Sequence, residues 1–129
     1  MNSIDEQMVM ASDVGAVIRS SGKHSKEEKI SVIHTLKTLA VFFEEIISEN
    51  KTFEIREDDR GYEVGDYLKL IEIEVDEENP DHPIKHTGRK AAVKVTYITD
   101  FKQQKNHVVM GIKKASLEGV KSAFPMNWP

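Results

Sequence analysis

Three charged side chains of complementary chemistry lie within six residues of one another: Lys51, Glu54 and Arg56. Lysine and arginine donate hydrogen bonds to phosphate or carbonyl oxygens, and a carboxylate accepts from an exocyclic amine. Together these residue types predict a small polar pocket for an anionic or base-like ligand. The alternative interpretation is a plain surface ion pair between Glu54 and Arg56, which would contribute roughly 0–1 kcal/mol.

The residues that carry these side chains have the pattern of a β-strand. Phe53 and Ile55 alternate with polar neighbours, and alternation of period two is typical of a half-buried strand. We expect Phe53 and Ile55 to face the core, and Glu54 and Arg56 to lie side by side on the opposite face.

A turn is expected directly after this strand, at residues 57–61 (E-D-D-R-G). Asp59 and Arg60 should bond each other or the backbone there. Order resumes at residues 64–66 (V-G-D), just before a second apolar run.

The remaining pattern predicts one main helix among strands. Thr38 should cap a helix from Leu39 to about Glu49, and Asn50 should end it. This helix has an apolar stripe wide enough to cover one end of a small barrel, formed by Leu39, Phe42, Phe43, Ile46 and Ile47. Further strands are expected at 29–36, 67–75, 89–101 and 107–113, with a surface loop at 77–83. The order β-α-β-β-β-β indicates an α+β fold built on a small mixed β-barrel.

Two segments lie outside the predicted barrel domain, which covers residues 30–114. Residues 1–29 are expected to form an extension, with a short amphipathic helix over Asp5–Arg19 and a flexible connector after it. Residues 115–129 contain Gly119, Pro125 and Pro129 and are expected to form a tail, whose Phe124 and Trp128 tuck against the body.

Composition narrows the class of protein. A chain of 129 residues is one domain, large enough to bury a modest core. The absence of cysteine excludes disulfides and thiolate metal sites. No apolar run approaches the roughly 20 residues of a membrane-spanning helix, and no secretory signal is visible, so we expect a cytoplasmic protein.

The net charge of −4 conceals a division along the chain. Residues 44–81 carry fifteen acidic and four basic side chains, whereas residues 85–114 carry eight basic side chains and one acidic. A basic face would suit a polyanion such as RNA, because backbone contacts from lysine and arginine dominate such affinities. Intramolecular charge pairing is the alternative.

An ordered series of motifs spans most of the chain. It comprises H-T-L-K at 34–37, F-F at 42–43, K-T-F-E-I-R at 51–56, V-G-D at 64–66, T-G-R at 87–89 and V-T-Y-I at 95–98. The series resembles the ASCH domain, in particular a largely uncharacterised bacterial and phage branch of it. That family belongs to the PUA-like superfamily of small β-barrels.

The resemblance implies a cleft beside the helix, with RNA or a modified nucleoside as its ligand. In the family pattern G-x-K-x-x-E-x-R, the lysine, glutamate and arginine match Lys51, Glu54 and Arg56. Glu49 stands where the pattern has glycine, which would ease the turn from helix to strand or let backbone approach a ligand.

The predicted nucleic-acid-binding residues are therefore Lys51, Glu54, Arg56, His34, Lys37, Arg60 and Arg89. For His34 the alternative is a buried histidine bonded to backbone. Tyr67 and Tyr97 are expected to pack in the core or to stack on a base. His82 and His86 lie in a proline-containing loop, so no metal site is expected, and no cofactor is implied.

We expect the chain to bind RNA or a nucleotide, with Lys51 and Arg56 on phosphate or a base carbonyl and Glu54 orienting the ligand. One branch of the family hydrolyses the amide of an acylated cytidine with a lysine base and a threonine nucleophile. Glu54 occupies the threonine position, which argues against that chemistry. Thr52 leaves open a rearranged hydrolase with Lys51 as base. A phage or host regulatory module that binds a protein through its N-terminal helix is a third possibility.

Overall fold

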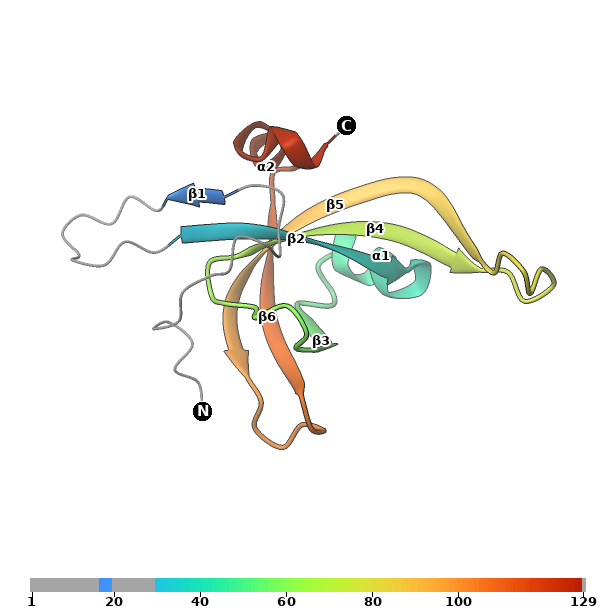
Figure 1. The fold of residues 1–129 in the computed structure, drawn as a ribbon, viewed down its shortest axis with the longest axis horizontal. Coiled ribbons are helices and arrows are strands. Elements are labelled where there is room, and N and C mark those ends of the chain that lie inside the picture. The colour runs from blue at the N-terminus through green and yellow to red at the C-terminus, as the bar shows by residue number, and fades with distance from the viewer. Residues whose placement is uncertain (1–16, 20–29, 129) are drawn as a thin grey trace.

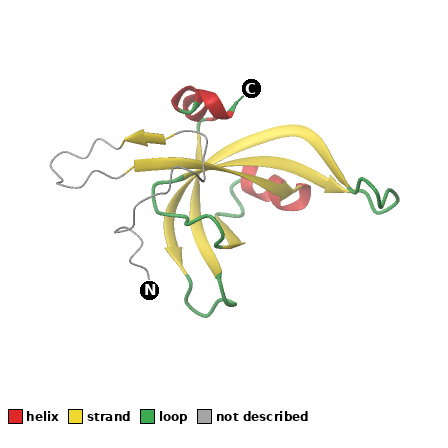
Figure 2. Cartoon of the chain, viewed as in Figure 1, coloured by secondary structure: helices red, strands yellow, loops and turns green. Residues whose placement is uncertain are grey.

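The computed structural model describes residues 17–19 and 30–128 and has an α+β fold (Figure 1 and Figure 2). Five strands form a curled half-barrel sheet, to which a three-residue strand is added; two helices and a 3₁₀ turn pack around it. The elements are β1 (Val17–Arg19), β2 (Ile30–Leu39), α1 (Ala40–Ile47), β3 (Phe53–Glu57), β4 (Tyr67–Val75), β5 (Ile84–Thr99), β6 (His107–Ala115), α2 (Leu117–Ala123) and η3 (Pro125–Asn127). The expected α+β class is confirmed. Among the described residues, no helix is long and apolar enough to cross a membrane.

The sheet is mixed and strongly bent. Its strand order is β1-β2-β4-β5-β6-β3, with β2 parallel to β4 and the other neighbouring pairs antiparallel. The long strand β5 belongs to both wings of the sheet, since it pairs with β4 and with β6 (Figure 1). Register shifts between Val95 and Tyr97 and between Ile71 and Ile73 mark irregular points of the kind that bend a strand.

The curl brings β2 and β3 close together. Arg56 of β3 donates a hydrogen bond to the carbonyl of Lys37 on β2, although no strand pairing joins the two. We call the gap between these two strands the seam.

The inner face of the sheet holds the main core. Helix α1 closes one end of it with Phe43 and Ile46, both almost completely buried. Burial of such a side chain contributes about 1.5–3 kcal/mol, so this helix is held mainly by its packing. The other buried members are Leu36, Tyr62, Leu68, Leu70, Val93, Val95, Ile98, Val108, Met110 and Ile112.

Helix α2 covers one corner of the outer face. Ser116 begins it, because its Oγ accepts from the N–H of Gly119 at 3.0 Å. Its Val120 and the following Phe124 are buried against Ile33 and Ala92. The sequence pattern did not predict this helix, but Phe124 packs on the body as expected.

The expected orientation of β3 is wrong. Phe53 and Ile55 are 43% and 50% exposed, whereas Glu54 is 4% exposed and faces the interior. The alternation was identified correctly, but its sense is reversed. Period two does not say which face is buried, and here the buried carboxylate is neutralised by two cations beside it.

Two further predictions need correction. Thr38 does not cap the helix: it is the buried ninth residue of β2, and Leu39 is the N-cap, without a side-chain hydrogen bond. The helix expected over Asp5–Arg19 is wrong at its last three residues, which form β1. The rest of that predicted helix lies outside the described residues.

The turn from α1 to β3 places a glutamate in a glycine conformation. Glu49 has φ 65°, in the left-handed region that favours glycine. Its carboxylate lies 3.9 Å from Lys114 Nζ, and both side chains are largely exposed, so this ion pair contributes little.

We expect Glu49→Gly to raise the free energy of unfolding by about 0.5–1 kcal/mol, because a β-carbon in the left-handed conformation is removed. Urea unfolding measures the change. Glu49→Gln is the matched control, since it removes the charge but keeps the β-carbon, and it should change stability by less than about 0.5 kcal/mol. Equal effects of the two variants would show that charge, not backbone strain, governs this position.

Candidate functional site

The structure brings Lys51, Glu54 and Arg56 into one ion cluster. Lys51 Nζ lies 2.9 Å from Glu54 Oε2, and Arg56 Nε lies 3.0 Å from Oε1 of the same carboxylate. Each oxygen of the buried Glu54 therefore accepts from a different cation. Lys51 sits in the connection that enters β3, and the strand places Glu54 and Arg56 on its inner face.

Two arginines join the strands across the seam. Arg56 Nη2 donates to the Lys37 carbonyl at 2.9 Å and to Thr38 Oγ1 at 3.3 Å. Arg60 Nη1 donates to the Thr35 carbonyl at 2.9 Å. Strand β1 pairs only with residues 30–32 of β2, so among the described residues the following stretch of β2 has no neighbouring strand on that side. Backbone carbonyls need partners, and here guanidinium groups take the place of that strand.

A cavity of about 430 Å³ opens at this seam. Its floor is the ion cluster, and its rim is apolar and exposed, with Leu39, Phe42, Phe53 and Ile55 around the opening. The full lining is Lys37, Thr38, Leu39, Phe42, Lys51, Phe53, Glu54, Ile55 and Arg56. Charged groups on the floor and aromatic rings at the rim suit a ligand that is flat and partly polar.

The two phenylalanines also hold Lys51. Its Nζ lies 4.6 Å from the ring centroid of Phe53 and 5.5 Å from that of Phe42, and it donates to the Phe53 carbonyl at 2.6 Å. A cation over aromatic faces gains roughly 0.5–2 kcal/mol in such positions. Lys51 is therefore oriented as a donor toward the cavity floor.

Several donors of the cavity remain available to a ligand. Within the described part of the chain, Lys37 is exposed and its Nζ has no hydrogen-bond or ion-pair partner. Arg56 uses Nε and Nη2, so the two N–H groups of Nη1 are unused. The cavity lining holds three cationic side chains and one carboxylate, Glu54. Its net charge is therefore positive, which favours an anionic ligand.

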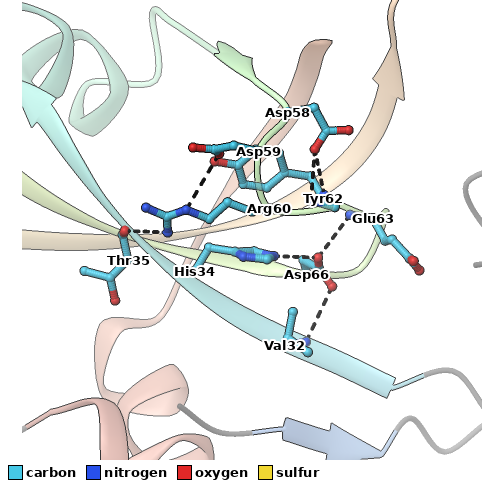
Figure 3. A network of polar contacts seen from close by, with 10 residues as sticks. Val32, His34, Thr35, Asp58, Asp59, Arg60, Tyr62, Glu63 and Asp66 are labelled. Carbon is cyan, nitrogen blue, oxygen red and sulfur yellow. Dashed lines mark hydrogen bonds and ion pairs between the residues drawn. The ribbon is translucent and has the colours of Figure 1, made fainter. Parts of the chain in front are cut away.

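His34 lies away from the cavity, inside the protein. Its Nε2 is 2.8 Å from Asp66 Oδ2, and its ring meets Tyr62 edge-on, with centroids 4.9 Å apart (Figure 3). Asp66 also accepts from the backbone N–H groups of Glu63 and Val32. This histidine fastens β2 to the approach of β4, so it is a buried polar residue, with a carboxylate rather than the backbone as its partner.

Arg60 belongs to the turn after β3, next to the cavity but not in its lining. Asp58 Oδ1 accepts from the N–H groups of Gly61 and Tyr62, which shapes the turn (Figure 3). Arg60 lies 3.8 Å from Asp59 and reaches across to Thr35. The expectation that Asp59 and Arg60 bond each other or the backbone is confirmed.

Arg89 is held in a separate cluster. It donates to both oxygens of the buried Glu72 and to Glu44 of α1, and it lies 5.0 Å from the Phe43 ring centroid. Hydrogen bonds from Arg89, and then from Thr87, hold the pKa of Glu72 below its usual range. Arg89 therefore ties β5 to β4 and α1 and does not line the cavity.

Sequence reasoning missed the apolar half of the site. Phe42 was assigned to the core-facing stripe of the helix, and Phe53 and Ile55 to the core, yet all three are exposed at the cavity. The exposure of Phe42 could have been predicted, because adjacent residues of a helix point in different directions. If Phe43 faces the core, Phe42 faces away from it.

Comparison with known proteins gives a family but no activity. A protein-family model, described as "Domain of unknown function (DUF3850)", matches residues 33–112. The chain belongs to this family. The match begins within β2 and ends within β6, so the DUF3850 domain contains the seam, its cavity and α1. No curated protein matches the chain.

We expect Glu54→Ala to lower the free energy of unfolding by about 2–3 kcal/mol, because it leaves two cations at the seam without their carboxylate. The loss is smaller than for a fully buried pair, since Lys51 and Arg56 keep partial access to water. Chemical denaturation measures it. The exposed Glu57 of the same strand is the control, and Glu57→Ala should cost less than about 0.5 kcal/mol.

The alkaline limb of the stability curve should depend on Tyr62. Burial raises the pKa of Tyr62 from 10.0 to about 12, while Arg60 and Arg56 act in the opposite direction. The folded state holds the neutral phenol, so its contribution is complete below pH 10 and is lost as pH rises through about 12. Tyrosinate absorbance should show one late phase, which Tyr62→Phe removes. A wild-type titration in which all tyrosines ionise near pH 10 would contradict this assignment.

Proposed function

We propose that this DUF3850 domain binds a nucleotide unit of RNA in the cavity at the seam. One observation carries the proposal: two exposed phenylalanines and three cationic side chains line the same 430 Å³ cavity around a buried carboxylate. Bases stack on aromatic faces, and lysine and arginine donate hydrogen bonds to phosphate oxygens.

The role proposed for each cavity side chain follows from the hydrogen-bonding groups that it has not used within the protein. Lys37 contacts the phosphate, because it has no partner in the described part of the chain and stands at the cavity wall. Arg56 offers its Nη1 hydrogens to a base carbonyl or a second phosphate oxygen. Glu54 retains unused lone pairs and accepts from an exocyclic amine. Phe42 and Phe53 stack on the base.

The proposal includes the finer family relationship. The motifs that resemble the ASCH domain contribute Lys37, Lys51, Glu54 and Arg56 to one cavity beside α1. A cleft beside the helix, lined by these motif residues, is what that resemblance implies. We infer that the half-barrel is a PUA-like barrel of the ASCH type.

The hydrolase alternative gains no support from the geometry. Lys51, the base of that alternative, already donates to Glu54 and to the Phe53 carbonyl. Thr52, the remaining candidate nucleophile, lines a hollow of about 80 Å³ that Lys51 lines as well. It is not part of the seam cavity, and the position equivalent to the nucleophile holds Glu54, whose two oxygens already accept from cations.

We expect the intact chain to bind nucleotides or short RNAs, with Lys37→Glu and Phe42→Ala each weakening affinity about tenfold or more. Both side chains are exposed and outside the core, so the variants should remain folded. Calorimetric titration with UMP, AMP, acylated cytidine and hexanucleotides measures binding, and the same samples are analysed for product.

Phe101→Ala and Lys105→Glu are the matched controls, because both residues lie in the loop between β5 and β6, outside the cavity. They should leave the affinity for mononucleotides unchanged. Equal losses from cavity and control variants would reduce the interaction to non-specific charge attraction. Product from acylated cytidine would replace the binding proposal with the hydrolase.

A further inference from the structure

The outer face of the sheet carries two exposed aromatic side chains in one cross-strand row, Phe53 and Tyr97. Tyr97 does not line the seam cavity. In register, Tyr97 of β5 pairs with Gly111 of β6, which pairs with Phe53 of β3. Residues that are direct partners on adjacent strands lie on the same face of the sheet. Tyr97 is 63% exposed, and Phe53 is exposed as well. The glycine between them carries no side chain, so backbone separates the two rings.

The exposure of Tyr97 beside this glycine is not explained by packing of its ring. A β-carbon on Gly111 would lie 3.1 Å from Thr96 Oγ1 and 3.5 Å from Tyr97 Cβ, which accounts for the glycine. Aromatic residues beside a glycine often lie over it and shield it. Tyr97 is too exposed to do so here, and the expectation that it packs in the core is wrong.

Two lysines stand in the next row along the same strands. Lys94 of β5 is the direct partner of Lys113 of β6, and both are exposed. Like charges placed opposite each other destabilise a sheet, and an anion lying between them relieves that repulsion. Among the described strand residues of these two rows on β3, β5 and β6, none is acidic.

The row is continuous with the seam cavity. Phe53 is both the last aromatic of the outer row and part of the cavity rim, and Ile55 next to it lines the cavity as well. Phe53 and Tyr97 are two strand spacings apart, roughly 10 Å, and stacked nucleotides advance about 3.4 Å each. A strand of about three nucleotides therefore spans the distance from the cavity to Tyr97.

We propose that the outer face of β3, β6 and β5 around Gly111 is a track for single-stranded RNA that continues from the seam cavity. The physiological ligand is then a nucleotide within a strand, not a free mononucleotide. One base occupies the cavity and a later base stacks on Tyr97, while the phosphates pass over Gly111 beside Lys94 and Lys113. This inference rests on the proposed function and names its ligand class.

The test compares mononucleotides with hexanucleotides on the full chain, using UMP, AMP, hexauridylate, hexaadenylate and the DNA hexamer of thymidylate. We expect hexamers to bind at least about tenfold more tightly than mononucleotides. Tyr97→Leu should weaken hexamer binding about fivefold or more, since it removes one stacking surface, and leave mononucleotide binding unchanged. Tyr97→Phe keeps the ring and should retain the wild-type affinity. Comparison of the RNA hexamers with the DNA hexamer distinguishes RNA from DNA as the bound strand.

The lysines are tested by the salt dependence of hexamer binding. The double variant Lys94→Ser, Lys113→Ser should make the slope of log affinity against log salt shallower by about 1.4, because two phosphate contacts are lost. Lys85→Ser is the control, since Lys85 lies at the start of β5, opposite Glu74 of β4, and not in the track. Its slope should change by less than half that amount.

The outcomes separate this inference from the proposed function. Hexamers that bind no better than mononucleotides, or hexamer binding indifferent to Tyr97, would overturn the track while the cavity stands. Hexamer binding that needs Tyr97 but not Lys37 or Phe42 would support the track and remove the cavity. Binding of none of these probes would overturn both.

Discussion

Arg56 is the side chain on which the rest of the structure depends. A half-barrel leaves two strands with unpaired backbone, and an open edge is prone to pair with other chains. Arg56 closes the gap from β3 by bonding the Lys37 carbonyl and Thr38 hydroxyl of β2, and Arg60 does the same at Thr35. The buried Glu54 holds the Arg56 guanidinium at the required angle through Nε. Closing the seam with side chains instead of a seventh strand leaves room for a cavity.

Because the seam is closed by side chains of β3, this strand has its charged side chains inside and its apolar side chains outside. Arg56 faces inward and donates to β2, and Glu54 on the same face accepts from Arg56. Phe53 and Ile55 are exposed as a result. The exposed rings are then available to both the cavity and the outer face. Leu36, Leu70 and Met110 follow the usual rule and lie in the core. Other buried charged side chains, such as Asp66 and Glu72, are likewise held by hydrogen-bonding partners.

The sequence predicts the order of elements well because the apolar patterns of most elements are unambiguous. The strand Tyr67–Val75 has the bounds expected of it, since turn-forming residues stand on both sides. The orientation of β3 could not be predicted, because alternation is the same for either face and only the tertiary partners of Glu54 decide it. Helix α2 was missed because Gly119 and nearby prolines weaken its signal, whereas tertiary burial of Val120 and Phe124 stabilises it.

The parallel pairing of β2 with β4 has a consequence for how the chain folds. Parallel neighbours require a crossover connection, and here that connection consists of α1, β3 and the turn with Asp58. Lys51, Glu54 and Arg56 therefore lie between two segments that must find each other over a long loop, which is a slow step. We therefore expect the seam cavity to assemble only after this closure, late on the folding pathway. A ligand that requires the closed seam would slow unfolding and leave the folding rate nearly unchanged.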